Sequence, residues 1–320
     1  MAIPIVIDCD PGHDDAIALL LAIASPEVEL LGVTTTYGNQ TIEKTTANAL
    51  RVLELAGRAV PVAAGAARPL ARDIAVAAHV HGESGLDGPA LPPPSTVQLE
   101  DDAIEAMARW IATAERPVTL VPTGPLTNVA RYLDAHGGEN LERIVLMGGA
   151  VAEGNMTPAA EFNVWADPEA AQAVFHSGLD VTMVGLDVTH RAVTTPEVQE
   201  RLRATGRIGA FVADLVDYFA RYHRETYGWE GAPIHDAVAV AHVVRPGLVE
   251  TRRLNVEVEL ESELCRGRTV VDLWHRTGRA ANAHVGVDLD TAGFFDLLVE
   301  RIGVLDAVAG DVPSAGCAGR

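Results

Sequence analysis

Four aspartates stand where the first predicted strand gives way to the first predicted helix. Residues 3–7 are apolar and mostly β-branched, which predicts a strand covered on both faces. Residues 16–24 are rich in Ala, Leu and Ile, which predicts a helix packed on the sheet. Between the two, Pro11 and Gly12 turn the chain. The acidic residues at this junction are Asp8, Asp10, Asp14 and Asp15.

This junction lies at the carboxyl end of a strand, where open α/β sheets bind their ligands. Carboxylates so close together repel, and some would take up protons unless a cation neutralises them. Ca²⁺ and Mg²⁺ bind proteins through carboxylate oxygens. The sequence therefore predicts a site for one of these cations. Capping of the helix explains one of the four aspartates, and Asp8 is the candidate for that role.

Strands and helices alternate along the chain, which is the pattern of a parallel sheet. We expect an α/β fold with an open, mostly parallel, Rossmann-like sheet flanked by helices. Residues 1–309 are expected to form a single domain, and residues 310–320 a disordered tail. Residues 58–100 are predicted to be irregular, and a loop of this length is usually functional or disordered. The expected strands cover residues 3–7, 28–36, 118–121, 144–147, 180–186, 254–260, 269–274 and 283–287.

Charge and cysteine content exclude several classes of protein. The net charge of −20 argues against a nucleic-acid partner. No basic region precedes the first apolar run, and no uncharged apolar stretch reaches about 18 residues, so we expect neither a signal peptide nor a membrane partner. Cys9, Cys265 and Cys317 are few and widely spaced, which suits reduced thiols in the cytoplasm. Carboxylates beside Cys9 would raise its pKa, so we expect a buried residue and not a nucleophile.

The chain lacks the motifs of the common nucleotide-binding and esterase folds. No Gly-x-Gly-x-x-Gly follows the first strand, and there is neither a Walker A lysine nor a Gly-x-Ser-x-Gly elbow. Asp8-x-Asp10 resembles the start of the haloacid-dehalogenase phosphatases, in which the first Asp is the nucleophile and the metal is Mg²⁺. Those enzymes continue Asp-x-Asp-x-Thr/Val, whereas this chain continues Pro11-Gly12.

Further polar motifs follow later strands or open later helices. Asn39 comes after the second strand, and Gly148-Gly149 allows close approach to the backbone. In an extended segment, Glu161 and Asn163 would point to one face. Asp236 stands at the head of an apolar helix.

The stretch from Asp8 to Asp15 closely resembles the N-terminal signature of the nucleoside hydrolases, the inosine–uridine-preferring family. Later motifs resemble those of the same family in the same order, over roughly residues 3–300. Any one motif is weak, but the ordered set is specific. The later motifs are Gly124-Pro125-Leu126-Thr127-Asn128, Met147-Gly148-Gly149, Gly154-Asn155, Glu161-Phe162-Asn163 and His235-Asp236.

The resemblance implies Ca²⁺-dependent hydrolysis of the N-glycosidic bond of ribonucleosides, which releases ribose and a free base for nucleoside salvage. It also implies a cytoplasmic homodimer or homotetramer with a small-molecule substrate. The nucleobase stays open, because the base contacts lie in loops at residues 75–90 and 222–235. Two alternatives also stay open, a Mg²⁺ phosphatase of the dehalogenase class and a non-catalytic nucleoside- or ribose-binding protein.

The same resemblance assigns roles to individual residues. Asp10, which would touch the attacking water, is the candidate general base. His235 is the candidate acid for the leaving base, and His81, near the nucleobase, is the second candidate. Tyr227 and Trp229 either stack on the base or anchor a lid. The calcium ligands implied are Asp10, Asp15, Asp236 and the carbonyl of Thr123; the ribose 2′- and 3′-hydroxyl contacts are Asp14, Asn39, Asn163 and Asp236; the 5′-hydroxyl contacts are Asn155 and Glu161; Met147 packs under the sugar.

Overall fold

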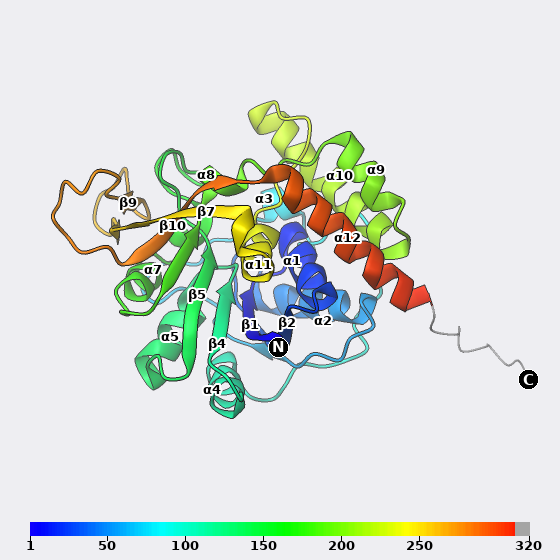
Figure 1. Cartoon of the computed structure of the whole chain (residues 1–320), viewed down its shortest axis with the longest axis horizontal. Helices are drawn as coiled ribbons and strands as arrows, with labels where there is room; N and C mark the ends of the chain where they lie inside the picture. Colours follow the sequence, from blue (N-terminus) through cyan, green and yellow to red (C-terminus); the bar gives the residue numbers. More distant parts are fainter. Residues whose placement is uncertain (311–320) are drawn as a thin grey trace, which may run out of the picture.

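Eight strands form one twisted sheet in the order β3-β2-β1-β4-β5-β6-β10-β7, and every pair is parallel except β10 with β7 (Figure 1). The computed structural model describes residues 1–310, so the predicted tail lies outside the described residues from residue 311 on. The expected α/β fold with an open, mostly parallel sheet is confirmed. The strands of the sheet are β1 (Ile3–Cys9), β2 (Val28–Thr35), β3 (Val62–Ala64), β4 (Val118–Pro122), β5 (Leu141–Met147), β6 (Val181–Val184), β7 (Val249–Leu254) and β10 (Ala283–Leu289).

Helices cover both faces of the sheet, and each face has its own apolar core. One face carries α1 (His13–Ala24), α2 (Ile42–Leu55), α11 (Asp236–Val244) and α12 (Thr291–Gly310), with α9 (Pro196–Arg203) and α10 (Arg207–Tyr227) packed outside them. The other face carries α4 (Ala103–Thr113), α5 (Thr127–His136) and α7 (Pro168–Phe175). Short helices are α3 (Ala78–His81), α6 (Phe162–Ala166), α8 (Leu186–Thr189) and η1 (Pro246–Leu248).

The C-terminal strands differ from the prediction. The expected strand at residues 254–260 is divided, because Leu254 ends β7 and the next strand, β8 (Val256–Val258), leaves the sheet. It pairs with β9 (Thr269–Val271) as a separate hairpin at one end of the molecule (Figure 1). The sequence of β7, Val-Glu-Thr-Arg-Arg-Leu, has no apolar run, as suits a charged edge strand, and was therefore missed.

Two short elements lie inside the segment predicted to be irregular. The edge strand β3 pairs with β2, and the four-residue helix α3 ends at His81. Neither is long enough to show a period of two or of 3.6 residues, so the sequence pattern could not reveal them. The remainder of residues 58–100 is irregular, as expected.

The first helix begins at His13, three residues earlier than the apolar pattern predicted, so Asp14 and Asp15 belong to its first turn. Oδ2 of Asp15 accepts a hydrogen bond from the backbone N–H of Gly12 at 3.0 Å and so caps the helix. The prediction that Asp8 is the capping residue is wrong.

Asp8 instead lies within β1, where its side chain joins neighbouring elements of the fold. Its Oδ1 accepts hydrogen bonds from Oγ1 of Thr34 at 2.6 Å and from Nδ2 of Asn128 at 2.8 Å. Burial raises the pKa of Asp8 to about 7. Cys9, the next residue, is fully buried, as expected.

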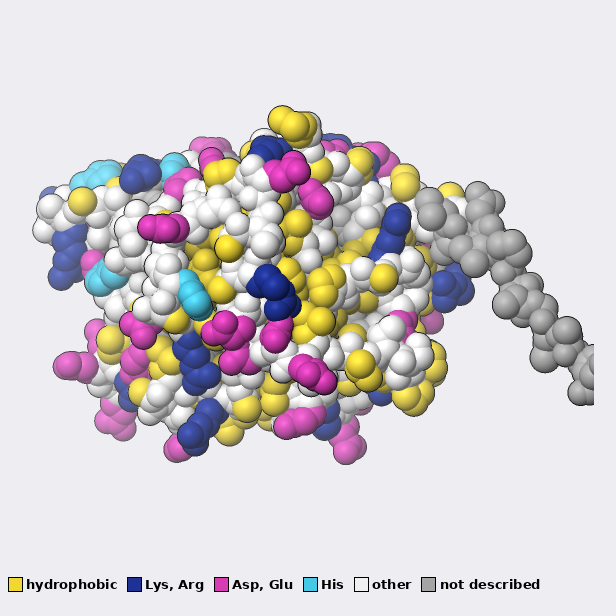
Figure 2. Space-filling model, turned by 90° about the horizontal axis from the view of Figure 1, so that it is seen from below, with side chains coloured by type: hydrophobic (Ala, Val, Ile, Leu, Met, Phe, Trp, Pro, Cys, Tyr) yellow, Lys and Arg dark blue, Asp and Glu magenta, His cyan; other side chains and the backbone are white. Residues whose placement is uncertain are grey.

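On the face of the molecule shown in Figure 2, acidic and basic side chains are interspersed. Although the chain has a net charge of −20, this face shows no region in which acidic side chains alone are gathered. Within residues 1–310, no helix combines the length and the apolar character needed to cross a bilayer.

Candidate functional site

A cavity opens at the carboxyl ends of β1, β4 and β5, which is the edge predicted to bind a ligand. It collects side chains from segments that are far apart in the sequence. Asp10 and Asp15 do not line the cavity but lie buried beside residues that do. Trp229 does not line it either, and its ring stacks on the ring of Tyr227, which does. The predicted site residues that line the cavity are Asp14, Asn39, His81, Thr123, Met147, Asn155, Glu161, Asn163, Tyr227, His235 and Asp236.

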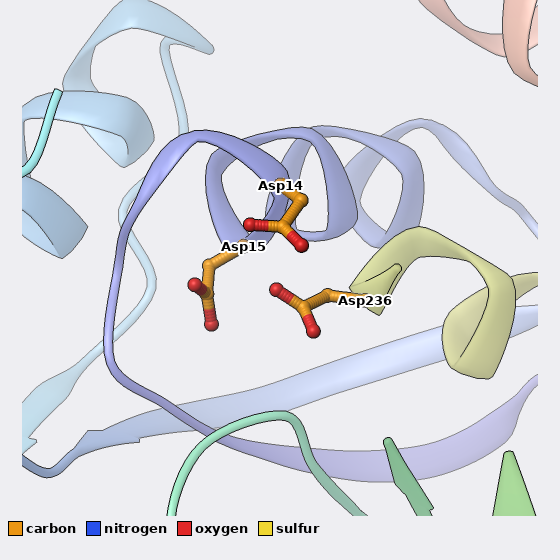
Figure 3. A group of neighbouring side chains, drawn as sticks. All are labelled: Asp14, Asp15 and Asp236. Carbon is orange, nitrogen blue, oxygen red and sulfur yellow. The ribbon is translucent and has the colours of Figure 1, made fainter. Parts of the chain in front are cut away.

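Three carboxylates point toward one another (Figure 3), and two of them, Asp14 and Asp236, line this cavity. Asp14 and Asp15 come from the first turn of α1, and Asp236 is the first residue of α11. One oxygen of each lies within 4.8 Å of the others, and all three side chains are buried. The packing of α1 against α11 therefore brings together residues more than two hundred positions apart.

Asp10 contacts Asp15 through its backbone N–H, which donates to Oδ1 of Asp15 at 3.3 Å, and its own carboxylate is held through one oxygen only. Its Oδ2 accepts a hydrogen bond from the backbone N–H of Asn39 at 2.6 Å. Its Oδ1 is buried and has no hydrogen-bond partner among residues 1–310. Gly124 leaves room for this oxygen, since a Cβ at that position would stand 2.5 Å from it.

This donor set fits a hard divalent cation. Burial, followed by the repulsion of neighbouring aspartates, raises the pKa of Asp10 and of Asp236 well above the ordinary range. Neither Lys nor Arg stands among the described residues that line the cavity, so no side chain supplies the opposite charge. A buried carboxylate oxygen without a hydrogen-bond partner, such as Oδ1 of Asp10, is suited to bind a cation. The site therefore suits a metal held by oxygen atoms, which both Ca²⁺ and Mg²⁺ accept.

Asp15 is fixed by neutral donors from two strand ends. Nδ2 of Asn39 donates to its Oδ2 at 2.9 Å, and Oγ1 of Thr123 donates to its Oδ1 at 2.8 Å. The carbonyl of Thr123, predicted to be a metal ligand, accepts from Nδ2 of Asn163 at 2.7 Å. A carbonyl oxygen has a second lone pair, so this bond leaves it able to bind a cation.

The side-chain amides of Asn39 and Asn163 donate their N–H groups to other residues of the protein. Nδ2 of Asn163 also lies 3.2 Å from the carbonyl of Met147. The Oδ1 atoms of both asparagines accept no hydrogen bond from any described residue, although both residues line the cavity. They are therefore available as acceptors for hydroxyl groups of a ligand.

The segment that holds Glu161 and Asn163 is not extended throughout, because Asn163 lies in α6 and Glu161, whose own backbone is extended, caps that helix. Its carboxylate accepts the backbone N–H groups of Gly149 at 2.8 Å, Asn163 at 2.8 Å and Val164 at 3.1 Å. Burial raises the pKa of Glu161 to about 6, although these donors oppose the shift. Oδ1 of Asn155 accepts the backbone N–H of Phe162 at 2.9 Å, which leaves its Nδ2 as a donor.

His235 stands immediately before α11 and lines the cavity. Its Nδ1 lies 2.8 Å from Oγ1 of Thr189, a hydroxyl that can donate or accept. Burial, with smaller contributions from His190 and His223, lowers the pKa of His235 well below its ordinary value.

Of the two predicted aromatic residues at the end of α10 and just beyond it, one lines the cavity. The rings of Tyr227 and Trp229 stack with centroids 4.9 Å apart, and the imidazole of His223 stacks on both. Tyr227 lines the cavity, whereas Trp229 meets the edge of His190 at 5.0 Å.

Sequence reasoning missed a second group of lining residues. Several of them follow one another at helical spacing on α10, and this aromatic face at three- and four-residue intervals is the signal that would have revealed them. The missed residues are Ala77, His79, Val80, Met156, Phe162, His190, Phe219, Tyr222 and His223.

Comparisons with known proteins agree with this geometry. The family profile described as "Inosine-uridine preferring nucleoside hydrolase" matches residues 5–296. The pyrimidine-specific ribonucleoside hydrolase RihA of Shewanella sp. (strain MR-4) is 52% identical over 309 residues, which covers 95% of this chain and 97% of the relative. RihA of Escherichia coli O7:K1 is 51% identical and covers 94% and 99%. A purine-preferring ribonucleoside hydrolase from Gardnerella vaginalis superposes with a TM-score of 0.89 at 33% identity, covering 95% and 99%.

Proposed function

The chain belongs to the inosine-uridine preferring nucleoside hydrolase family, and from this premise we propose that it is a Ca²⁺-dependent hydrolase of pyrimidine ribonucleosides. The proposed reaction adds the oxygen of water to C1′ of the sugar, breaks the C1′–N bond and transfers a proton to the departing base. The observation that carries the proposal is the partnerless Oδ1 of Asp10 beside the buried cluster of Asp14, Asp15 and Asp236. The preference for pyrimidines rests on the names of the relatives that are about half identical to this chain.

The proposed metal ligands are Asp10, Asp15, Asp236 and the carbonyl of Thr123. When bound, Ca²⁺ would neutralise these carboxylates and polarise the oxygen atoms that complete its coordination. The four ligands come from three separate parts of the fold, the β1–α1 junction, the end of β4 and the start of α11, and such a set suits Ca²⁺, whose coordination geometry is less strict than that of Mg²⁺.

The remaining side chains bind the sugar and move protons. Oδ1 of Asp10 accepts the proton of the attacking water as general base. The free acceptors of Asn39 and Asn163, with the carboxylate of Asp14, hold the 2′- and 3′-hydroxyls, while Asn155 and Glu161 hold the 5′-hydroxyl. Met147 packs under the ring, and the buried carboxylates stabilise the positive charge that develops on the sugar.

His235 donates the proton to the departing base, directly or through water. Burial keeps the imidazole neutral at rest, so His235 takes up a proton from solvent as the C1′–N bond breaks. With Nδ1 held by the hydroxyl of Thr189, Nε2 gives its proton to the base and the ring returns to its neutral form. Tyr227 covers the base, and the ring of Trp229 holds Tyr227 in place by stacking on it.

The phosphatase alternative is not favoured. Asp8, which would be its nucleophile, lies in β1 with its Oδ1 bonded to Thr34 and Asn128 and does not line the cavity. The lining also lacks the Lys and Arg side chains that hold phosphate groups. A binding protein without activity would differ from the proposed enzyme only in turnover.

The test is the release of ribose from uridine and cytidine by the full chain. We expect turnover that EDTA abolishes and that Ca²⁺ restores, with no phosphate released from p-nitrophenyl phosphate under the same conditions. Restoration by Mg²⁺ and not by Ca²⁺ would refute the proposed metal, and tight nucleoside binding without ribose release would refute the enzyme. The family resemblance also leads us to propose a cytoplasmic homodimer or homotetramer, which light scattering and cell fractionation test.

A further inference from the structure

His13, the one non-acidic side chain between the turn and the acidic pair, is enclosed by aromatic rings. Its imidazole lies nearly parallel to the rings of Tyr218 and Phe219, each with centroids 5.3 Å away. The side chain is fully buried in the first turn of α1, the turn that also holds Asp14 and Asp15. The mechanism above assigns it no role.

Both ring nitrogens of His13 have partners. Nε2 lies 2.8 Å from the backbone carbonyl oxygen of Asp87, and Nδ1 lies 3.1 Å from Nδ1 of His81. Gly12 permits this approach, since a Cβ there would stand 2.5 Å from Nδ1 of His81. His81 lines the cavity, and its Nε2 makes no hydrogen bond to any described residue.

The partners decide where the protons lie. A carbonyl oxygen only accepts, so Nε2 of His13 carries a proton. Both nitrogens of His13 contact neutral partners and the ring is buried between the rings of Tyr218 and Phe219, so the imidazole is neutral. A neutral imidazole has one N–H, so Nδ1 of His13 presents a lone pair. Two lone pairs 3.1 Å apart repel, and Nδ1 of His81 therefore carries the proton that lies between the rings.

One contact favours the opposite arrangement. The backbone N–H of His13 points at Nδ1 of His81 from 3.3 Å and would donate to a lone pair there. That arrangement would set unprotonated Nε2 of His13 against the carbonyl of Asp87 at 2.8 Å, or leave the two Nδ1 atoms without a proton between them. The shorter contacts outweigh the longer one.

We propose that His13 is a positioning residue that holds His81 with its proton on Nδ1, so that Nε2 of His81 accepts a hydrogen bond from an N–H group of the nucleobase. The inference rests on the proposed function for its ligand. Uracil offers N3–H and cytosine its amino group as such donors. In this tautomer His81 has no proton to give the departing base, so the acid role falls to His235 alone.

The first test is the ¹⁵N NMR spectrum of histidine side chains in the full-length wild-type protein without substrate. His81→Gln identifies the His81 resonances by their loss. We expect a protonated shift at Nδ1 of His81 and an unprotonated shift at Nε2. The reverse pattern would overturn the proposal. This measurement needs neither a variant of His13 nor any activity, so it is separate from the test of the proposed function.

The second test removes the acceptor. His13→Phe keeps a ring between Tyr218 and Phe219 and keeps the backbone N–H at residue 13, but it leaves His81 without a lone pair opposite Nδ1. We expect His81 to change to the Nε2–H tautomer. Tyr218→Phe keeps the ring that stacks on His13 and is the matched control, for which we expect the wild-type pattern. An unchanged tautomer in His13→Phe would contradict the role of His13.

The third test is kinetic and separates positioning from folding. His13→Phe should lower kcat/KM for uridine about 10- to 100-fold, the range for leaving a buried hydrogen-bonding group mismatched. It should leave kcat/KM for p-nitrophenyl riboside within about threefold, since that leaving group offers no N–H to His81. Equal losses on the two substrates would mean that His13 only supports the fold of the metal site.

Discussion

The backbone N–H of Asn39 holds one carboxylate oxygen of Asp10 at 2.6 Å and leaves the other oxygen, buried, without a partner. The bond joins the ends of β1 and β2, and it fixes the direction in which the free oxygen points. Gly38 makes this possible, because a Cβ there would lie 2.1 Å from Oδ2 of Asp10. A carboxylate aimed in this way is prepared for a cation on one side and a proton from water on the other.

The first prediction concerns this free oxygen. Asp10→Asn keeps an acceptor for the N–H of Asn39 but removes the charge and the base, and Asp10→Ala removes all three. We expect kcat for uridine to fall at least about 10³-fold in both variants, the scale of losing general-base catalysis together with metal positioning. Ribose release at saturating Ca²⁺ measures the loss. Asp134→Asn, at an exposed position on α5, is the control, and a tenth of wild-type activity in Asp10→Ala would disprove the assignment.

The acidic junction could be predicted because its signal is local. An apolar run, a Pro-Gly turn and a second apolar run place Asp10 and Asp15 within one turn of the chain. Asp8 was misassigned because its partners, Thr34 and Asn128, come from other elements and are invisible in a local pattern. Asp15 caps the helix instead, and it is also one of the proposed metal ligands.

The contact of His13 with His81 could not be predicted either, because it too joins residues that are far apart in the sequence. It joins residues 68 positions apart, and one of them lies on a four-residue helix inside a long irregular segment. Hydrophobic periodicity predicts whole helices and strands but not a 3.1 Å contact between the first residue of one helix and the last residue of another. The edge strand β7 was missed for a different reason. Its charged residues suit an exposed edge, and they do not form the apolar pattern by which a strand is predicted.

The second prediction concerns the sugar. Asn39, Asn163 and Asp14 offer acceptors to the secondary hydroxyls, and a site built around a hydroxyl leaves buried groups unpaired when that hydroxyl is absent. We expect kcat/KM for 2′-deoxyuridine to be at least about 10³-fold lower than for uridine. Steady-state assays of ribose and deoxyribose release make the comparison. Similar kcat/KM values for the two nucleosides would refute the ribose contacts.

The third prediction concerns the pH dependence of stability. Burial, and to a smaller extent Arg143, lowers the pKa of His242 on α11 to about 4, whereas the unfolded chain protonates near its ordinary value. The unfolded state therefore binds the proton first, and stability is lost as the pH falls from about 6.5 toward 4. His242→Leu removes this loss, so between pH 7 and pH 5 the wild type should lose about 2 kcal/mol more free energy of unfolding than the variant.

Urea unfolding of both proteins in EDTA at the two pH values measures the difference. The buried aspartates titrate equally in both proteins and cancel from it. His136→Leu, at an exposed position at the end of α5, is the control and should follow the wild type. Equal losses in the wild type and in His242→Leu would show that His242 is charged in the folded protein.

The last prediction concerns His235 and the leaving group. The need for a proton differs between leaving groups, since a nucleobase departs poorly as an anion whereas p-nitrophenolate departs as a stabilised one. His235→Ala should therefore lower kcat for uridine by about 10²- to 10⁴-fold, the usual range for general acid catalysis. It should leave p-nitrophenyl riboside cleavage within about tenfold of the wild type, because Asp10 and the ribose contacts remain.

A variant of its partner separates the proton from the position of the ring. Thr189→Val removes the hydroxyl 2.8 Å from Nδ1 of His235 but leaves the imidazole in place, so its loss on uridine should be smaller than that of His235→Ala and should be absent with p-nitrophenyl riboside. Equal losses on the two substrates in His235→Ala would mean that the residue supports Asp236 and the metal site. Little loss on either would return the acid role to His81, and the tautomer assigned to His81 would then be wrong as well.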